Sequence, residues 1–263
     1  TKYGLMNYIY IFTNKKTLTS FIITFRYALI TVPLKLIFAL FIAYILNFKI
    51  KCVNLFRTIY YIPSILGGSV AIAVLWKALF KEDGIINMLL SFIGIQGPSW
   101  LADPDYAMVV IIVLRVWQFG SAMIIFAAGL KEIPGSYYEA AEIDGAGPIR
   151  TLVTVYLPLS LPSLATLALF YAVGRWNGFS DALMYLKSSK AEKYWPIQLL
   201  LYNIIKNSTQ SSEIATQEGF FSAGVSKTIQ MAPVMFATVP ILLVYPWLQR
   251  YFVTGVTIGA VKG

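Results

Sequence analysis

The side chains that most often perform catalysis or bind metals are scarce in this sequence of 263 residues. There is no histidine, and the single cysteine is Cys52. This composition excludes Ser-His-Asp and Cys-His catalysis, zinc bound by histidine or by several cysteines, and any disulfide within the chain. We therefore expect no catalytic residues and no metal site.

The positions of the carboxylates along the chain bear on the class of transport protein. All twelve Asp and Glu residues lie outside the five longest apolar stretches. Proton-driven carriers usually bury a carboxylate near the middle of the membrane, so this pattern argues against a secondary carrier. Of the basic residues that enter these stretches, Arg26, Lys77 and Arg175 lie near span ends, whereas Arg115 lies nearer the middle of its span. It serves either a structural hydrogen bond or a polar pore lining.

One segment between two apolar stretches has the pattern of a docking element. Ser136 is a good helix N-cap, and Glu139, three residues later, completes a capping box. We expect a two-turn helix over Tyr137–Asp144, with Gly145 as its left-handed stop and a second short helix from Pro148. Because this segment is more elaborate than a connector needs to be, we predict that it docks into a partner's groove.

The composition is that of an integral membrane protein. Hydrophobic residues make up 58% of the chain, charged residues make up 13%, and the mean hydropathy is +0.69. A typical globular protein has roughly 25% charged residues. The net charge of +9 is spread over loops and span ends. We therefore expect membrane lipid and an acidic protein partner, and no nucleic acid.

A bilayer core of about 30 Å needs about 20 mostly apolar residues as helix. Five stretches qualify, each containing Pro, Gly or a lone basic residue, where neighbouring helices can tolerate a kink. They are Ser20–Leu46, Arg57–Phe80, Tyr106–Leu130, Leu157–Trp176 and Ile229–Trp247. The predicted fold class is therefore an all-α bundle of five transmembrane helices, in a single transmembrane domain over residues 1–263.

The sequence also predicts the form of the segments outside these spans and the side of the membrane on which each lies. Residues 1–19 are expected to form an external amphipathic segment, residues 131–156 a cytoplasmic loop, and residues 248–263 a cytoplasmic tail. Residues 177–228 are expected to form an external loop with one short helix, followed by an exposed polar loop over Asn207–Glu218. Loop charges place Asn47–Arg57 inside, although five lysines in Asn177–Lys227 oppose this orientation. The chain does not begin with Met, which indicates a trimmed N-terminus.

The docking segment resembles the signature loop of binding-protein-dependent ABC importer permeases. That pattern is Glu-Ala-Ala, three residues, Gly, nine residues, then Ile-x-Leu-Pro. Here it is matched by Glu139-Ala140-Ala141, Gly145 and Val155-x-Leu157-Pro158, and Val155 is the only departure. Six fixed positions at fixed spacing make an accidental match by a capped connector a poor explanation.

The resemblance extends along the chain and favours the carbohydrate branch, of maltose type or lipo-oligosaccharide type. The segment RTIYYIPSILGGSVAIAVLWKALF is similar to one permease subunit of such importers. From about Leu157 onward, LFYAVGRWNGFSDALMYL and the terminal GVTIGAVKG are similar to the other subunit. Which subunit this chain represents, and which sugar it carries, stay open. The family core usually has six spans.

This resemblance implies a non-catalytic permease in the bacterial inner membrane. Its implied partners are a second permease subunit, two cytoplasmic ATPase subunits, an extracellular solute-binding protein and a sugar substrate. The chain itself would bind no cofactor, since ATP and Mg belong to the ATPases. The residues implied to dock on the ATPases are Tyr138, Glu139, Ala140, Ala141, Asp144, Gly145, Leu157 and Pro158.

Sugars are usually held by aromatic stacking and a few directional hydrogen bonds. The candidates for the substrate pathway, of which Gln118 is the best single one, are Tyr60, Tyr61, Arg115, Trp117, Gln118, Tyr171, Trp176 and Asn177. An aromatic belt at the membrane surface, or ordinary packing, is the competing interpretation for each aromatic residue. Other functions left open are an amino-acid or peptide importer permease and an ATP-independent secondary carrier.

Overall fold

The structure is a computed structural model of the whole chain. It describes residues 9, 13–48, 51–186, 189–217, 234–235, 237–243 and 246; at residues 142, 189–190 and 208–217 only the backbone is described. The predicted amphipathic segment at the N-terminus, most of the span predicted over Ile229–Trp247 and the predicted tail over 248–263 lie outside these residues.

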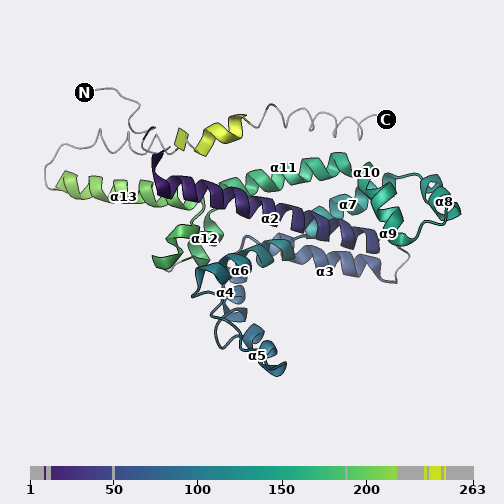
Figure 1. The fold of residues 1–263 in the computed structure, drawn as a ribbon, viewed down its shortest axis with the longest axis horizontal. Helices are drawn as coiled ribbons and strands as arrows, with labels where there is room; N and C mark the ends of the chain where they lie inside the picture. Colours follow the sequence, from purple (N-terminus) through teal and green to yellow (C-terminus); the bar gives the residue numbers. More distant parts are fainter. Residues whose placement is uncertain are drawn as a thin grey trace. The chain divides into compact units, whose positions relative to one another are not determined.

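Every regular element in the described residues is helical, which confirms the all-α prediction (Figure 1). The α-helices are α2 (Lys15–Ile45), α3 (Val53–Leu66), α4 (Val70–Leu79), α5 (Ile85–Phe92), α6 (Pro104–Trp117), α7 (Gly120–Glu132), α8 (Gly135–Ile143), α9 (Pro148–Thr151), α10 (Leu157–Leu159), α11 (Leu161–Asn177), α12 (Ser180–Tyr185) and α13 (Ile197–Gln217). A π-helical turn, η1, spans Leu152–Tyr156, and a 3₁₀ helix, η2, spans Ser189–Tyr194.

Four of the five predicted spans have counterparts among the described residues. By length and composition, α2 can cross a membrane, and so can Pro104–Glu132, in which α6 and α7 follow each other with a short break at Gln118 and Phe119. The other two are bent pairs, with an angle of 103° between α3 and α4 and 73° between Pro148–Leu159 and α11. The span predicted over Arg57–Phe80 is therefore broken at Gly67-Gly68. The span predicted from Leu157 becomes a continuous α-helix only from Leu161.

Helix α2 shows the reversed polarity of a lipid-embedded helix. Its polar side chains Thr17, Ser20, Thr24, Thr31 and Lys35 are buried. Large apolar side chains are exposed along it, among them Ile22, Leu29 and Ile37. The buried positions recur at intervals of three, four and seven residues, so they share one face of the helix. This arrangement suits a helix whose outer face contacts lipid and whose inner face carries the polar groups.

The chain forms two compact units. Among the described residues, unit 2 comprises Leu29–Trp76 and Ile112–Ala172. Its core joins side chains of α2 and α7, including Leu36, Ala43, Met123 and Phe126, with Tyr156 and Leu167. Helices α3 and α7 pack against each other. They can approach closely because Gly120 has no Cβ, since a Cβ there would collide with the backbone of Tyr60 and lie 2.7 Å from the Tyr61 Cα.

Unit 1 comprises the described residues of Thr1–Ala28, Lys77–Ile111 and Val173–Trp247. A small core here brings Trp176 together with Ile197, Leu200 and Leu201 of α13. Helix α13 corrects one prediction, because the polar run expected to be a loop from Asn207 is helical as far as Gln217. The apolar start of α13 is anchored in this core, and the helix continues through residues of ordinary helix propensity.

Candidate functional site

The predicted docking loop is a pair of short helices at one end of unit 2 (Figure 1). Helix α8 begins at Gly135, so Ser136 lies inside the first turn and not at the predicted N-cap. Gly145 has φ +67°, and the Ala146 N–H donates to the Ala141 carbonyl at 2.8 Å. These are the features of a Schellman stop, which confirms the predicted left-handed end at Gly145. Helix α9 starts with Pro148 at its first position, also as predicted.

The inner side of this loop is held by tyrosines. The Tyr44 hydroxyl donates to the Pro148 carbonyl at 2.8 Å, and the Tyr138 hydroxyl donates to the Leu130 carbonyl at 3.2 Å. The Tyr156 ring lies between them, with ring centroids 4.8 Å from Tyr44 and 5.0 Å from Tyr138. Burial, followed by the contact with Tyr156, raises the pKa of Tyr138. The Tyr138 hydroxyl therefore stays protonated and remains a donor.

The outer side of the loop is open. Of the predicted docking residues, Glu139, Ala140, Asp144, Gly145 and Pro158 are exposed. The other three face inward: Ala141 is buried, and Tyr138 and Leu157 pack against the core of unit 2. Two large apolar side chains stand out from the same loop, Ile143 with 86% and Ile149 with 78% of its surface exposed. A face that combines acids with exposed isoleucines is suited to contact another protein.

A second group of predicted residues meets where two spans of unit 2 are interrupted. The Gln118 amide accepts from the Arg115 guanidinium at 2.9 Å and donates to the Gly67 carbonyl at 3.3 Å. Trp117 lies beside Trp76, with 5.2 Å between ring centroids. Gln118 is only 5% exposed. In this conformation its amide therefore binds the backbone at the C-terminal end of α3. Its role in the substrate pathway stays a prediction.

Ser64 and Ser121 extend this network. Ser64 Oγ donates to the Gln118 carbonyl and accepts from the Ser121 N–H, both at 3.0 Å. Ser121 Oγ lies 2.7 Å from the Tyr171 hydroxyl. The Lys35 ammonium sits 3.9 Å above the Tyr171 ring, a cation–π geometry, and Lys35 is 9% exposed. Unit 2 thus holds a polar network inside an apolar core.

The sequence did not single out three members of this network: Lys35, Ser64 and Ser121. A lysine within an apolar span is itself a signal, because such residues usually face a bundle interior. The serines gave no comparable signal. Of the remaining aromatic candidates in unit 2, Tyr60 packs on Phe119 at 5.7 Å, and Tyr61 is exposed.

The last two predicted pathway residues, Trp176 and Asn177, belong to unit 1. Trp176 is buried, packs edge-to-face on Phe21 and Phe25, and donates from Nε1 to the Ala237 carbonyl at 3.0 Å. Asn177 is exposed. The aromatic ring of Trp176 is therefore engaged in packing in this structure.

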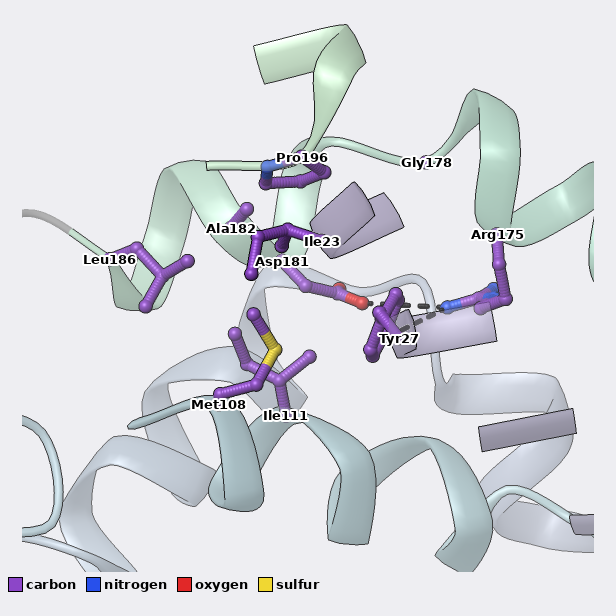
Figure 2. A pocket seen from close by; sticks show the side chains of 10 residues that line it. All are labelled: Ile23, Tyr27, Met108, Ile111, Arg175, Gly178, Asp181, Ala182, Leu186 and Pro196. Carbon is purple, nitrogen blue, oxygen red and sulfur yellow. Dashed lines mark hydrogen bonds and ion pairs between the residues drawn. The ribbon is translucent and has the colours of Figure 1, made fainter. Parts of the chain in front are cut away.

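Unit 1 also contains a small, mostly apolar pocket that the sequence did not predict. Arg175 and Asp181 pair across it at 3.6 Å, and Arg175 donates to the Tyr27 hydroxyl at 3.4 Å. Both charged side chains are less than one-fifth exposed. Figure 2 shows these three side chains converging, with Met108 and Ile111 below them. The apolar surroundings strengthen the pair, since few waters can screen it.

No group of three or more His, Cys, Asp or Glu side chains in the described ranges is placed to hold a metal ion.

Comparison with known families fits this membrane architecture. The model described as "Binding-protein-dependent transport system inner membrane component" matches residues 5–258. The chain belongs to this family. As a member of this family of transport components, it is a multi-pass protein of the inner membrane, and the sequence resemblance is confirmed.

Several curated permeases of this kind are similar to the chain. The probable ABC transporter permease protein YesP of Bacillus subtilis is 45% identical over 186 residues, 70% of this chain and 60% of YesP. The polygalacturonan/rhamnogalacturonan transport system permease protein YtcP of B. subtilis is 41% identical over 141 residues, 54% of this chain and 48% of YtcP. The lactose transport system permease protein LacF of Rhizobium radiobacter is 31% identical over 187 residues, 69% of this chain and 62% of LacF. The matches thus span about half to three-fifths of these relatives.

The fold has solved counterparts. A crystal structure of a bacterial ABC transporter involved in the import of the acidic polysaccharide alginate contains a chain that aligns with a TM-score of 0.68. The alignment covers 89% of this chain and 83% of that chain, at 21% identity. The same transporter with an alginate pentasaccharide-bound periplasmic protein also aligns with a TM-score of 0.68, at 21% identity, covering 88% of this chain and 82% of that one. At this identity the likeness shows a shared fold.

Proposed function

We propose that the chain is a transmembrane permease subunit of an ATP-driven, solute-binding-protein-dependent importer of sugars, with oligosaccharides as the substrate class. It forms half of the translocation pathway and docks on the ATPase subunits through the loop of Glu139 to Gly145. It performs no bond chemistry and binds no cofactor of its own, because ATP and Mg belong to the partner ATPases.

The observation that carries this proposal is the docking loop. Gly145 ends α8 in a left-handed conformation, which turns the chain sharply and leaves Glu139 and Ile143 exposed on one short helix. Tyr138 attaches this helix to the core of unit 2, and Tyr44 attaches the neighbouring helix α9 to the same core. An exposed element on a rigid base is what a permease needs to receive force from a moving ATPase.

The substrate class is supported by the relatives. Those named above include permeases for polygalacturonan/rhamnogalacturonan and for lactose. We propose that the sugar passes the polar network of Arg115, Gln118 and Tyr171, with Trp117 beside it, after a conformational change that opens this partly buried group. The partners are a second permease, two ATPase subunits and an extracellular solute-binding protein.

Binding-protein-stimulated ATP hydrolysis tests this function. The chain is assembled in nanodiscs with the second permease and the ATPases encoded beside it, and the binding protein is added with oligogalacturonides, lactose or a dipeptide. We expect hydrolysis to rise with one of the sugars and not with the dipeptide. Stimulation by the dipeptide alone would favour a peptide importer.

A further inference from the structure

Three tyrosines from three separate elements meet on the inner side of the docking loop. Tyr44 lies at the end of α2, Tyr138 lies in the first half of α8, and Tyr156 ends η1. Tyr156 stacks against both of the others, edge-to-face with Tyr44 and tilted with Tyr138. The three rings therefore form one continuous contact across the loop.

The hydroxyl groups of this cluster bind at defined points. Tyr44 holds the first residue of α9 through the Pro148 carbonyl at 2.8 Å. Tyr138 holds the last full turn of α7 through the Leu130 carbonyl at 3.2 Å. The Asn47 amide donates to the Tyr156 hydroxyl at 3.2 Å. Each of these bonds joins the loop, or η1 beside it, to the end of a spanning helix.

The three tyrosines are held in place by the core of unit 2. Tyr44 and Tyr156 belong to the buried core of unit 2, and Tyr138 packs against that core. Tyrosine has few rotatable bonds, so rings packed in this way keep their orientation. The neighbouring Tyr137 points elsewhere, since it is more than half exposed and belongs to no ring pair among the described residues.

We propose that Tyr44, Tyr138 and Tyr156 form a tyrosine clamp that transmits movement of the docking loop to the end of α2. The three are positioning residues, and this role rests on the proposed function, in which ATPase subunits bind the outer side of the loop. Coupling between the docking loop and the end of α2 needs a physical connection between them whose arrangement is affected from both ends. The clamp supplies it, because α9 cannot shift without moving Tyr44 or breaking its bond to Pro148, and α8 is linked to Tyr44 through the rings of Tyr138 and Tyr156.

Hydrogen–deuterium exchange of the assembled complex tests the clamp. Exchange is measured with and without the ATP analogue AMP-PNP, in peptides that cover residues 135–151 and residues 40–48. The variants are the double substitution Tyr44→Phe with Tyr138→Phe, which removes two hydroxyls and keeps both rings, and the matched control Tyr137→Phe. Subunit content of each purified complex establishes that it assembles.

In the wild type and in Tyr137→Phe, AMP-PNP is expected to change exchange in both regions. In the double variant the change in residues 135–151 should persist and the change in residues 40–48 should be lost. An unaltered response of residues 40–48 in the double variant overturns the clamp and leaves the docking function in place. No response of residues 135–151 in the wild type overturns the docking function, and with it the clamp.

Discussion

The side-chain amide of Gln118 donates a hydrogen bond to the carbonyl oxygen of Gly67, 51 residues earlier in the chain, at 3.3 Å. This contact joins the break between α3 and α4 to the break between α6 and α7. It depends on the missing side chain of Gly67, because a Cβ there would lie 2.6 Å from Gln118 Oε1 and 2.7 Å from Nε2.

Gly67→Ala is therefore expected to displace the Gln118 amide and to break its bonds to Gly67 and Arg115. We expect this substitution to lower the free energy of unfolding by about 1–3 kcal/mol. The matched control is Gly68→Ala, where a Cβ meets nothing within 4 Å. Thermal unfolding in detergent measures both variants, and equal melting temperatures would contradict this role of Gly67.

Gly145 is expected to be essential for coupling. Its φ of +67° is unfavourable for a β-branched residue, so Gly145→Val should strain the turn by about 1–2 kcal/mol and misalign α8. Gly145→Asn is the control, since Asn tolerates this conformation. We expect Gly145→Val to insert normally and lose binding-protein-stimulated ATP hydrolysis, while Gly145→Asn retains most of it. Full activity of Gly145→Val would show that the stop is dispensable.

Removing one partner of the Arg175–Asp181 pair is expected to destabilise unit 1, because the pair is largely buried. Asp181→Ala leaves the Arg175 charge in an apolar pocket and should cost about 2 kcal/mol or more. The control is Glu192→Ala, whose pair with Lys16 is shorter, at 2.9 Å, but exposed. It should change stability by about 0–1 kcal/mol. Chemical denaturation measures both, and similar costs would refute the importance of burial.

Cys52 reports the orientation of the chain. It is exposed, immediately precedes α3 and lies in the loop predicted to be cytoplasmic. A membrane-impermeant maleimide is expected to leave intact cells unlabelled at this thiol and to label it after permeabilisation. Cys52→Ser is the control for labelling at any other site. Equal labelling of intact cells would invert the predicted topology and place the Glu139 loop outside.

The parts of the fold that the sequence predicted are those specified by local signals. Gly145 determines where α8 ends and Pro148 determines where α9 begins, because each acts on its own neighbours. The start of α8 at Gly135 lies two residues before the predicted one, since Ser136 is not its N-cap. The glycines in the span predicted over Arg57–Phe80 indicated a place for a kink, but the angle of 103° depends on what packs against both halves. A sequence pattern contains no such information.

The contacts within the polar network could not be predicted in the same way. Lys35 and Tyr171 lie 136 positions apart, and only the packing of unit 2 brings the ammonium over the ring. Gln118 was predicted to contact the substrate because it is a polar residue beside Trp117. In the structure its side-chain amide binds the Gly67 carbonyl and Arg115. Residue type indicated a polar interior, while the pairing within it required the fold.

Sugar uptake by proteoliposomes tests the central claim most directly. The complex is reconstituted with the binding protein and labelled oligogalacturonide or lactose on one side and ATP on the ATPase side, for the wild type, Glu139→Lys and Glu192→Lys. Glu192→Lys is the control, because it makes the same charge change at an exposed position of unit 1. We expect ATP-dependent uptake by the wild type and Glu192→Lys and its loss in Glu139→Lys, because the reversed charge disrupts docking. Uptake by the chain alone, driven by an ion gradient and unaffected by Glu139→Lys, would contradict the account.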